Sequence, residues 1–518
     1  MANQGADERP EADGKESDRN RSGTGRALLL TAASVVLPGI AHLRSGRRAA
    51  GTAILAVYAL LIAGAATAGV LLAGNMARGA RMAVQSEWLL TAAAAAFVLA
   101  VLWMTVIVHS WVITRPRPAG AGVRIGGAAL VLVLCLCVAA PAGAVMHTSY
   151  TAYDTLTSVF GGGGVDGEPH DAADPWNGRD RIEVLLIGGD SGSNRYGMRT
   201  DSVMLASIDV HDGDTVLISL PRNLEDVQFP KGSKLAEAYP PPYGFNDIFN
   251  EIYQTIAEDP EQLAENPQAT DPAADTLKGV VGHITGLEAE YYALVDMKGF
   301  EAVIDAIGGI DVHIDEPIPY GQEGAVLEAG DQHLNGNQAL WYGRSRVNSD
   351  DYTRMGRQGC LVKYVVEQAD PATVLTSFQE LAGATKKTLR TDIPQAKLPA
   401  FIELAETVSE EGEMKSLQLS PPQVNPAYPD WKEIRRLVAD AVSAQQDDEK
   451  GGDDRAAEPE PSASDSSPSP SEEGAEEGAG EDGDSTEWQD YTGLPEPSPT
   501  TPGRQVGDDA TSLDSICP

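Results

Sequence analysis

Three long apolar runs near the start of the chain constrain its fold more than any other feature. They cover residues 52–73, 88–113 and 125–145. Each is about long enough to cross a hydrocarbon core of roughly 30 Å as a helix. The runs repeat and extend too far for a cleaved signal peptide. The sequence therefore predicts three membrane-spanning helices.

A shorter apolar segment at residues 27–43 precedes these runs and is interrupted by Pro38-Gly39. We interpret it as a re-entrant or interfacial segment, so that the membrane region covers residues 27–146. The polar residues 1–26 before it are expected to form a disordered cytoplasmic N-terminus. If the short segment were instead a full span, the N-terminus would lie outside.

Arginines between the apolar runs predict the orientation, because cytoplasmic loops carry an excess of Lys and Arg. Two clusters flank the spans: Arg44, Arg47 and Arg48 before the first, and Arg115, Arg117 and Arg124 between the second and the third. With both clusters in the cytoplasm, everything after Met146 lies outside. The chain is then expected to be a multi-pass protein of the cell membrane with an extracytoplasmic domain.

Composition divides the remainder into three parts. Residues 147–179 are polar and Gly-rich, as in a flexible linker. Residues 180–444 have the composition of a globular domain. Residues 445–518 are rich in Asp, Glu, Ser, Pro and Gly, and we expect a disordered acidic tail because such a segment buries too little apolar surface. A solvated spacer is the simpler interpretation of this tail, and a specific acidic binding segment is the alternative.

Short and long apolar patterns alternate within residues 180–444. Short runs that end at turn residues predict strands, at 183–187, 202–208, 215–220, 291–295 and 310–314. Longer patterns predict helices, at 245–256, 275–284, 297–307, 337–343, 351–368 and 431–442. The turn His211-Asp212-Gly213-Asp214 joins the second and third strands as a hairpin. This alternation predicts an α/β class with layered α–β–α architecture.

Charged residues gather at turns in three groups: Asp190, Arg199 and Asp201; Arg222 after a strand; and Arg344, Arg346, Asp351, Arg354, Arg357 and Gln358. Two carboxylates on nearby loops could hold a hard cation such as Mg²⁺. Arg354, Arg357 and Gln358 have the spacing of one helix face. Guanidinium groups match phosphate oxygens, so the arginines indicate an anionic partner. The alternative is surface arginines in weak salt bridges.

An ordered set of motifs runs through the globular region. It opens with the stretches 184–190, 199–205 and 217–222, and continues through 249–253, 295–296, 308–312, 334–336, 339–346 and 351–358. This set resembles the LytR–CpsA–Psr family over about residues 181–366. The set is specific as a whole, although each motif alone is weak. It departs from the family at Asn223, where the family often has Asp, and in the Pro-rich stretch 231–243.

The resemblance implies a phosphotransferase that moves a glycopolymer from a polyprenyl-pyrophosphate carrier to a peptidoglycan hydroxyl and forms a phosphodiester. It implies Mg²⁺ as cofactor, with membrane lipid, the lipid-linked glycan and peptidoglycan as partners. Nucleic acid is not expected as a partner, because the net charge is −38 and wide nucleic-acid binding needs a basic face. A non-catalytic module that binds lipid-linked precursors, or a polyprenyl-pyrophosphate pyrophosphatase, remains an alternative.

The resemblance also assigns roles to residues. It makes Asp190 and Asp201 the metal-site acids. It implies catalytic roles for Arg222, Asp351 and Arg354, with Asp351 orienting the arginines or helping to deprotonate the acceptor. The residues that it places around the pyrophosphate are Arg199, Arg222, Arg344, Arg346, Arg354 and Gln358.

The four cysteines fall into two pairs in different parts of the sequence. Cys135 and Cys137 lie in an apolar run and are expected to act as small hydrophobic residues. Cys360 and Cys517 both fall outside the membrane in the expected topology, where disulfides are permitted. A bond between them is one interpretation, and a buried inert Cys360 with a free Cys517 is the other.

Overall fold

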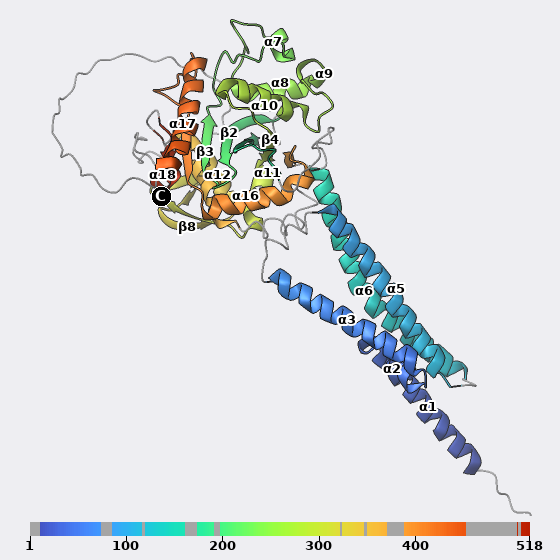
Figure 1. Cartoon of the computed structure of the whole chain (residues 1–518). Coiled ribbons are helices and arrows are strands. Elements are labelled where there is room, and N and C mark those ends of the chain that lie inside the picture. Colours follow the sequence, from blue (N-terminus) through green and yellow to red (C-terminus); the bar gives the residue numbers. More distant parts are fainter. Residues whose placement is uncertain are drawn as a thin grey trace, which may run out of the picture. The chain divides into compact units, whose positions relative to one another are not determined.

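The computed structural model describes residues 11–73, 85–116, 120–160, 174–190, 197–321, 324–346, 350–369, 388–451, 505 and 509–517. The chain divides into two units: Met1–Gly161 with Pro394–Ile402, and Gly162–Ile393 with Glu403–Pro518. We call them unit 1 and unit 2 and describe each separately (Figure 1).

Unit 1 is helical. Its helices are α1 (Glu11–Val36), α2 (Ile40–Arg44), α3 (Arg48–Ala73), α5 (Ser86–Thr114) and α6 (Ala121–Phe160). Among the described residues, three helical segments are long and apolar enough to cross a membrane: Arg48–Thr67, Glu87–Thr114 and Ala121–Asp154. They coincide with the three apolar runs of the sequence, which indicates a membrane protein.

The boundaries of unit 1 differ from the expectation in two places. Residues 11–26, expected to be disordered, form the first part of α1. Residues 147–160, expected to be linker, extend α6 to Phe160. The segment at 27–43 forms the end of α1 and most of α2, with a break at Gly39, whose φ of +98° favours glycine.

Unit 2 is built on a seven-stranded sheet of order β11-β10-β3-β2-β1-β4-β9. Strand β1 pairs antiparallel with β2 and parallel with β4, and β3 pairs parallel with β10. The strands are β1 (Arg181–Asp190), β2 (Arg199–Asp209), β3 (Thr215–Leu220), β4 (Tyr291–Asp296), β9 (Leu389–Thr391), β10 (Met414–Gln418) and β11 (Thr511–Ser512).

The predicted hairpin between β2 and β3 is confirmed, because the two strands pair antiparallel. Gly213 in its turn has a φ of +82°. A Cβ at this glycine would lie 2.6 Å from the backbone nitrogen of Val408, so a side chain there would be both strained and crowded.

Successive residues of the central strands face opposite layers, as strand geometry requires. Leu205 and Ile218 belong to a core shared with α8 (Ile252–Glu258), α10 (Pro272–Thr285) and α17 (Trp431–Gly451). Their neighbours Met204 and Leu217 pack on the other side with Val362 of α13 (Asp351–Gln368). Helices therefore cover both faces of the sheet, and the predicted layered α–β–α class is confirmed (Figure 1).

The described chain contains further helices and strands. The helices are α7 (Lys234–Ala238), η1 (Phe249–Glu251), α9 (Pro260–Leu263), α11 (Met297–Ala306), α12 (Gly336–Arg344), η2 (Gln395–Lys397), α16 (Leu398–Glu410) and α18 (Leu513–Ile516). The strands are β5 (Ile310–Ile314), β6 (Ile318–Tyr320), β7 (Ala325–Leu327) and β8 (Gly330–Leu334). The helix expected at 245–256 begins only at Phe249, as η1 followed by α8.

The end of the acidic tail is not disordered, which corrects the expectation for residues 445–518. Strand β11 pairs antiparallel with β10, and Leu513 of α18 is buried. Cys517 forms a disulfide with Cys360 of α13, with an S–S distance of 2.08 Å. The segment is ordered because its few apolar and strand-forming residues pair with β10 at the edge of the sheet. Residues 446–451 also differ, since α17 extends to Gly451, while residues 452–504 lie outside the described part of the chain.

Candidate active site

The ends of β1 and β2 carry the first charged pair. Asp190 ends β1 opposite Arg199 of β2, next to a shift in register between Gly188 and Gly189. The Asp190 carboxylate is nearly buried, and its Oδ2 accepts a hydrogen bond of 3.2 Å from Arg344 Nη2. Arg344 is the last residue of α12. This contact joins the first and third charged groups of the sequence.

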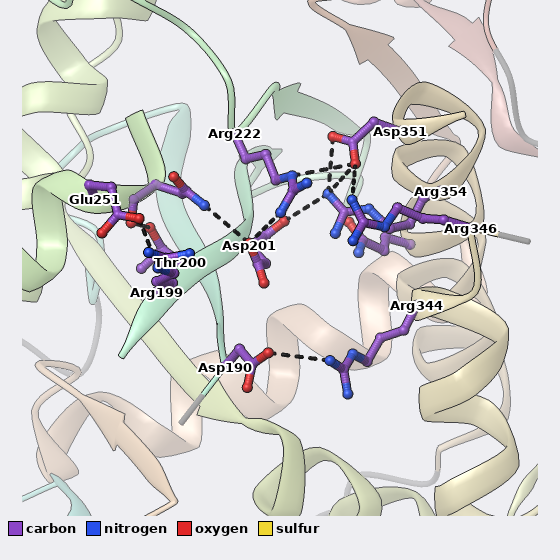
Figure 2. Close-up of polar contacts among 12 residues, drawn as sticks. Asp190, Arg199, Thr200, Asp201, Arg222, Glu251, Arg344, Arg346, Asp351 and Arg354 are labelled. Atoms are coloured by element: carbon purple, nitrogen blue, oxygen red, sulfur yellow. Dashed lines mark hydrogen bonds and ion pairs between the residues drawn. The ribbon is translucent and has the colours of Figure 1, made fainter. Parts of the chain in front are cut away.

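A larger cluster centres on Asp201 and Asp351 (Figure 2). Arg222, just past β3, donates from Nη1 to Asp201 Oδ1 at 3.0 Å, and its Nε lies 3.4 Å from Asp351 Oδ1. Arg354, on α13, donates from Nη2 to Asp351 at 3.2 Å and to the backbone oxygen of Asp201 at 3.2 Å. Arg346 Nη1 lies 4.0 Å from Asp351 Oδ1. Figure 2 shows all of these side chains converging.

The electrostatics of this cluster are dominated by its arginines. Three guanidinium groups face two carboxylates, which leaves one excess positive charge. Burial favours a higher pKa for Asp201, but Arg222, Arg354 and a hydrogen bond from Asn250 together hold its pKa below the ordinary value. Burial favours a lower pKa for Arg222, but Asp351 and Asp201 raise it overall. Both groups are therefore charged at neutral pH.

Arg354 has an unused donor. Its side chain is only 5% exposed, and its Nε is buried without a hydrogen-bond partner among the described residues. Burial lowers the pKa of Arg354, and Asp351 counteracts this shift. A buried N–H without an acceptor is costly, so this atom marks a point where an anionic oxygen would be stabilised.

Arg199 occupies a different environment. Its Nε lies 2.7 Å from Glu251 Oε1, and its side chain is 46% exposed. In Figure 2 this pair lies on the opposite side of Asp201 from Asp351. The structure therefore brings Arg222, Arg346 and Arg354 together around the two carboxylates but gives Arg199 a separate partner.

Arg357 and Gln358 support α12 instead of turning to the cluster. Arg357 donates to the backbone oxygens of Tyr342 at 3.0 Å and Ser345 at 2.9 Å, and Gln358 donates to that of Gly343 at 3.1 Å. Gln358, which the resemblance places at the pyrophosphate, thus contacts the backbone of α12 in this structure, as does Arg357. The carbonyls at a helix end need donors, and these two residues supply them directly beside Arg344.

A family comparison bears on this arrangement. Residues 164–427, about half of the chain, match the model of the LytR_cpsA_psr family. The chain belongs to the LytR–CpsA–Psr family. The motif order that resembled this family is thereby confirmed.

Individual relatives are more distant. The chain is 25% identical over 221 residues to a protein of Bacillus anthracis named polyisoprenyl-teichoic acid–peptidoglycan teichoic acid transferase TagU, a match that covers 42% of this chain and 62% of the relative. A protein of the same name from Enterococcus faecalis is 26% identical over 223 residues, covering 42% and 63%. The chain thus spans less than two thirds of the length of these relatives.

Among solved structures, the chain is similar to TagV of Bacillus subtilis. The two are 20% identical with a TM-score of 0.38, and the match covers 52% of this chain and 98% of TagV.

The two acids that the family resemblance assigns to a metal lie on neighbouring strands. Asp190 faces Arg199 in the pairing of β1 with β2, and Asp201 follows two residues later. The described residues contain no group of three or more His, Cys, Asp or Glu side chains arranged for a metal. Mg²⁺, however, is commonly held by one or two carboxylates together with substrate phosphates. Asp190 and Asp201, at the same end of two paired strands, are carboxylates of the kind that such a site uses.

Sequence reasoning missed one member of the site. Asn250, in η1, is buried and donates from Nδ2 to Asp201 Oδ1 at 3.2 Å, and its Oδ1 has no partner within the described residues. Its backbone oxygen accepts from Thr200. The available signal in the sequence for a buried polar residue was the position of Asn250 between the apolar Phe249 and Ile252. Both of these apolar residues are buried.

Proposed function

We propose that this chain transfers a glycopolymer from a polyprenyl-pyrophosphate carrier to a peptidoglycan hydroxyl. The observation that carries the proposal is the excess positive charge around Asp201 and Asp351, with the unused Nε of Arg354 inside it. A pyrophosphate supplies the anionic oxygens that such a cluster stabilises. The names of the Bacillus and Enterococcus relatives support transfer of this kind.

The proposed step is a displacement at the phosphorus that carries the glycan. The acceptor oxygen forms a bond to this phosphorus, and the bond from phosphorus to the bridging oxygen breaks. The carrier leaves as a polyprenyl phosphate, and the glycan is left in a phosphodiester. Arg222 and Arg354 stabilise the charge that builds on the leaving phosphate, and because Asp351 already orients them they need little reorganisation.

Asp351 has two roles open to it in this step. Its contacts with Arg222, Arg346 and Arg354 make it the residue that fixes the guanidinium groups. It is also a carboxylate beside the proposed phosphate position, where it can accept the proton of the acceptor hydroxyl. Mg²⁺ held by Asp190 and Asp201 would neutralise charge on the phosphate oxygens.

The proposed location of unit 2 is the outer side of the cell membrane. The arginine clusters at residues 44–48 and 115–124 favour a cytoplasmic position for both loops, which puts the end of α6 outside. A reporter fused after Gln445 should be active only if it works outside the cytoplasm. Activity of a reporter that works only in the cytoplasm contradicts this topology.

The activity can be tested with the full chain in detergent or nanodiscs. The donor is a short-chain polyprenyl-pyrophosphate glycan, and the acceptor is a peptidoglycan fragment. We expect a phosphodiester product by mass spectrometry, dependent on both substrates. Cleavage of the donor at the same rate without acceptor indicates a pyrophosphatase, and donor binding without any turnover indicates a binding module. Either result overturns the proposal.

A further inference from the structure

Unit 1 contains a polar cluster that the transfer reaction does not use. His42 of α2 is 2% exposed. Its Nε2 lies 2.8 Å from Nδ1 of His109 on α5. On the other side of the same ring, His109 Nε2 lies 3.4 Å from Arg47 Nη1. His42 and Arg47, five residues apart in the chain, are thus joined through the distant His109 in one chain of hydrogen bonds.

The direction of these bonds follows from Arg47, because a guanidinium can only donate. His109 Nε2 must then accept, so the proton of the neutral His109 ring is on Nδ1. His109 Nδ1 donates to His42 Nε2, and the proton of the His42 ring is therefore on its Nδ1. The chain of bonds ends in a donor on His42.

That donor has no acceptor. His42 Nδ1 is buried without a hydrogen-bond partner among the described residues, and so is Oγ of Ser110, which follows His109 on α5. Ser110 is fully buried. Buried polar groups are normally paired, so an N–H fixed by an arginine and left open indicates a ligand with an acceptor atom.

The surroundings select an anion. Arg44 and Arg48 flank this part of the chain, and Arg115 and Arg124 stand at the adjoining ends of α5 and α6. Residues 27–86 contain no Asp or Glu. Residues 88–153, which hold Arg115 and Arg124, also contain no Asp or Glu, so all four arginines lie in stretches of the chain without acidic residues, unlike those of the candidate active site.

We propose that the open Nδ1–H of His42 binds a phosphate group of an anionic membrane lipid, while Arg47 acts through His109 to fix which ring nitrogen of His42 carries the proton. A lipid is favoured over free phosphate because exposed apolar side chains lie just before α2 in the chain: Val36 is 68% exposed and Leu37 is 46% exposed. A headgroup phosphate at His42 would place acyl chains along such surfaces. Basic sites between transmembrane helices bind anionic headgroups in this manner.

The test uses the full chain in nanodiscs that contain phosphatidylglycerol and phosphatidylcholine, with retained lipids counted by native mass spectrometry. We expect preferential retention of phosphatidylglycerol by the unmodified chain. His42→Leu should reduce that preference on the order of tenfold, the loss of one charge-assisted hydrogen bond. His42→Asn, which offers an N–H close to the Nδ1 position, should restore most of it.

His147→Leu on α6 is the matched control, because it removes an exposed histidine of the same unit, and it should retain the preference. Equal retention of the two lipids, or an unchanged preference in His42→Leu, overturns the proposal. So does a failure of His42→Asn to restore binding. A third arm adds inorganic phosphate: displacement of the lipid by phosphate alone would show a free-phosphate site and overturn the lipid assignment. The proposal does not depend on the transfer activity of unit 2.

Discussion

The two units use arginine in opposite ways. In unit 2, Arg222 and Arg354 are held by Asp201 and Asp351 before any substrate arrives. In unit 1, Arg47 contacts His109, and the stretch 27–86 offers no carboxylate. A carboxylate orients a guanidinium group and neutralises its charge. A neutral histidine accepts a hydrogen bond from the guanidinium group, which fixes the protonated nitrogen of the histidine ring, and leaves the positive charge uncompensated. The first arrangement suits a reaction that needs orientation, and the second suits attraction of an anion.

Removal of a pre-oriented arginine should lower turnover by orders of magnitude. We expect Arg222→Ala to lower turnover by about 10²- to 10³-fold, the usual cost of one preorganised donor in a transition state. Initial rates with the polyprenyl-pyrophosphate donor measure this loss. Arg436→Ala is the control, since Arg436 on α17 pairs only with exposed carboxylates in the described structure, and its rate should not change. A rate for Arg222→Ala close to the unmodified value removes Arg222 from the mechanism.

Substitution of Asp201 tests the metal together with the orientation of the arginines. Asp201→Ala should abolish Mg²⁺-dependent turnover, because a hard cation bridging phosphate oxygens needs this carboxylate. A magnesium titration of initial rates measures it. Wild-type rates with unchanged Mg²⁺ dependence rule the assignment out.

The pKa of Asp201 also predicts how the stability of the fold changes at acid pH. Its pKa is lowered in the folded protein, so its ionised form adds stability above the unfolded pKa of about 3.9, and this contribution is lost as pH falls through the folded value. Asp201→Asn should therefore flatten the acid branch of the unfolding curve. A steeper acid branch in the variant contradicts the stated direction of the pKa shift.

The disulfide links two distant segments of unit 2 covalently. Cys360 lies on α13, which also carries Asp351 and Arg354, and it joins Cys517 across 157 residues. We expect Cys517→Ser to lower the free energy of unfolding by at most about 2–4 kcal/mol, measured by denaturant unfolding. Cys135→Ser, which removes a free cysteine of unit 1, is the matched control. Two freely alkylated cysteines in oxidatively purified protein would contradict the bond itself.

Sequence reasoning succeeded where the determinants are local. The hairpin at Gly213 and the helix from Asp351 follow from a turn residue and from periodicity. Strand β10 was not predicted, because its residues include the polar Lys415 and Gln418 and it becomes a strand only by pairing with β3. Strand β11 has two residues and depends on the same edge. Neither short segment carries a pattern that identifies its partner.

In the candidate site, too, the sequence predicted local features but not tertiary contacts. Arginines at the ends of predicted elements were recognised as a group, but their spacing did not predict which of them converge. Arg199 and Arg222 both adjoin strand ends, yet one contacts Glu251 and the other contacts Asp201. Side-chain direction and the position of η1 decide this, and both depend on tertiary packing.

The smallest expected effect comes from Glu251, which pairs with Arg199 at 2.7 Å. Glu251→Gln removes one half-exposed ion pair, so the free energy of unfolding should change by less than about 1 kcal/mol. If Arg199 also contacts the donor pyrophosphate, removing the competing carboxylate should lower KM for the donor about two- to threefold at an unchanged kcat, which is a few tenths of a kcal/mol in binding. Steady-state kinetics at fixed Mg²⁺ separate the two constants. Arg199→Gln in the same assay should raise KM instead. If kcat falls in Glu251→Gln, the carboxylate orients Arg199 for the reaction, and Arg199 then belongs with the pre-oriented arginines instead of the exposed ones.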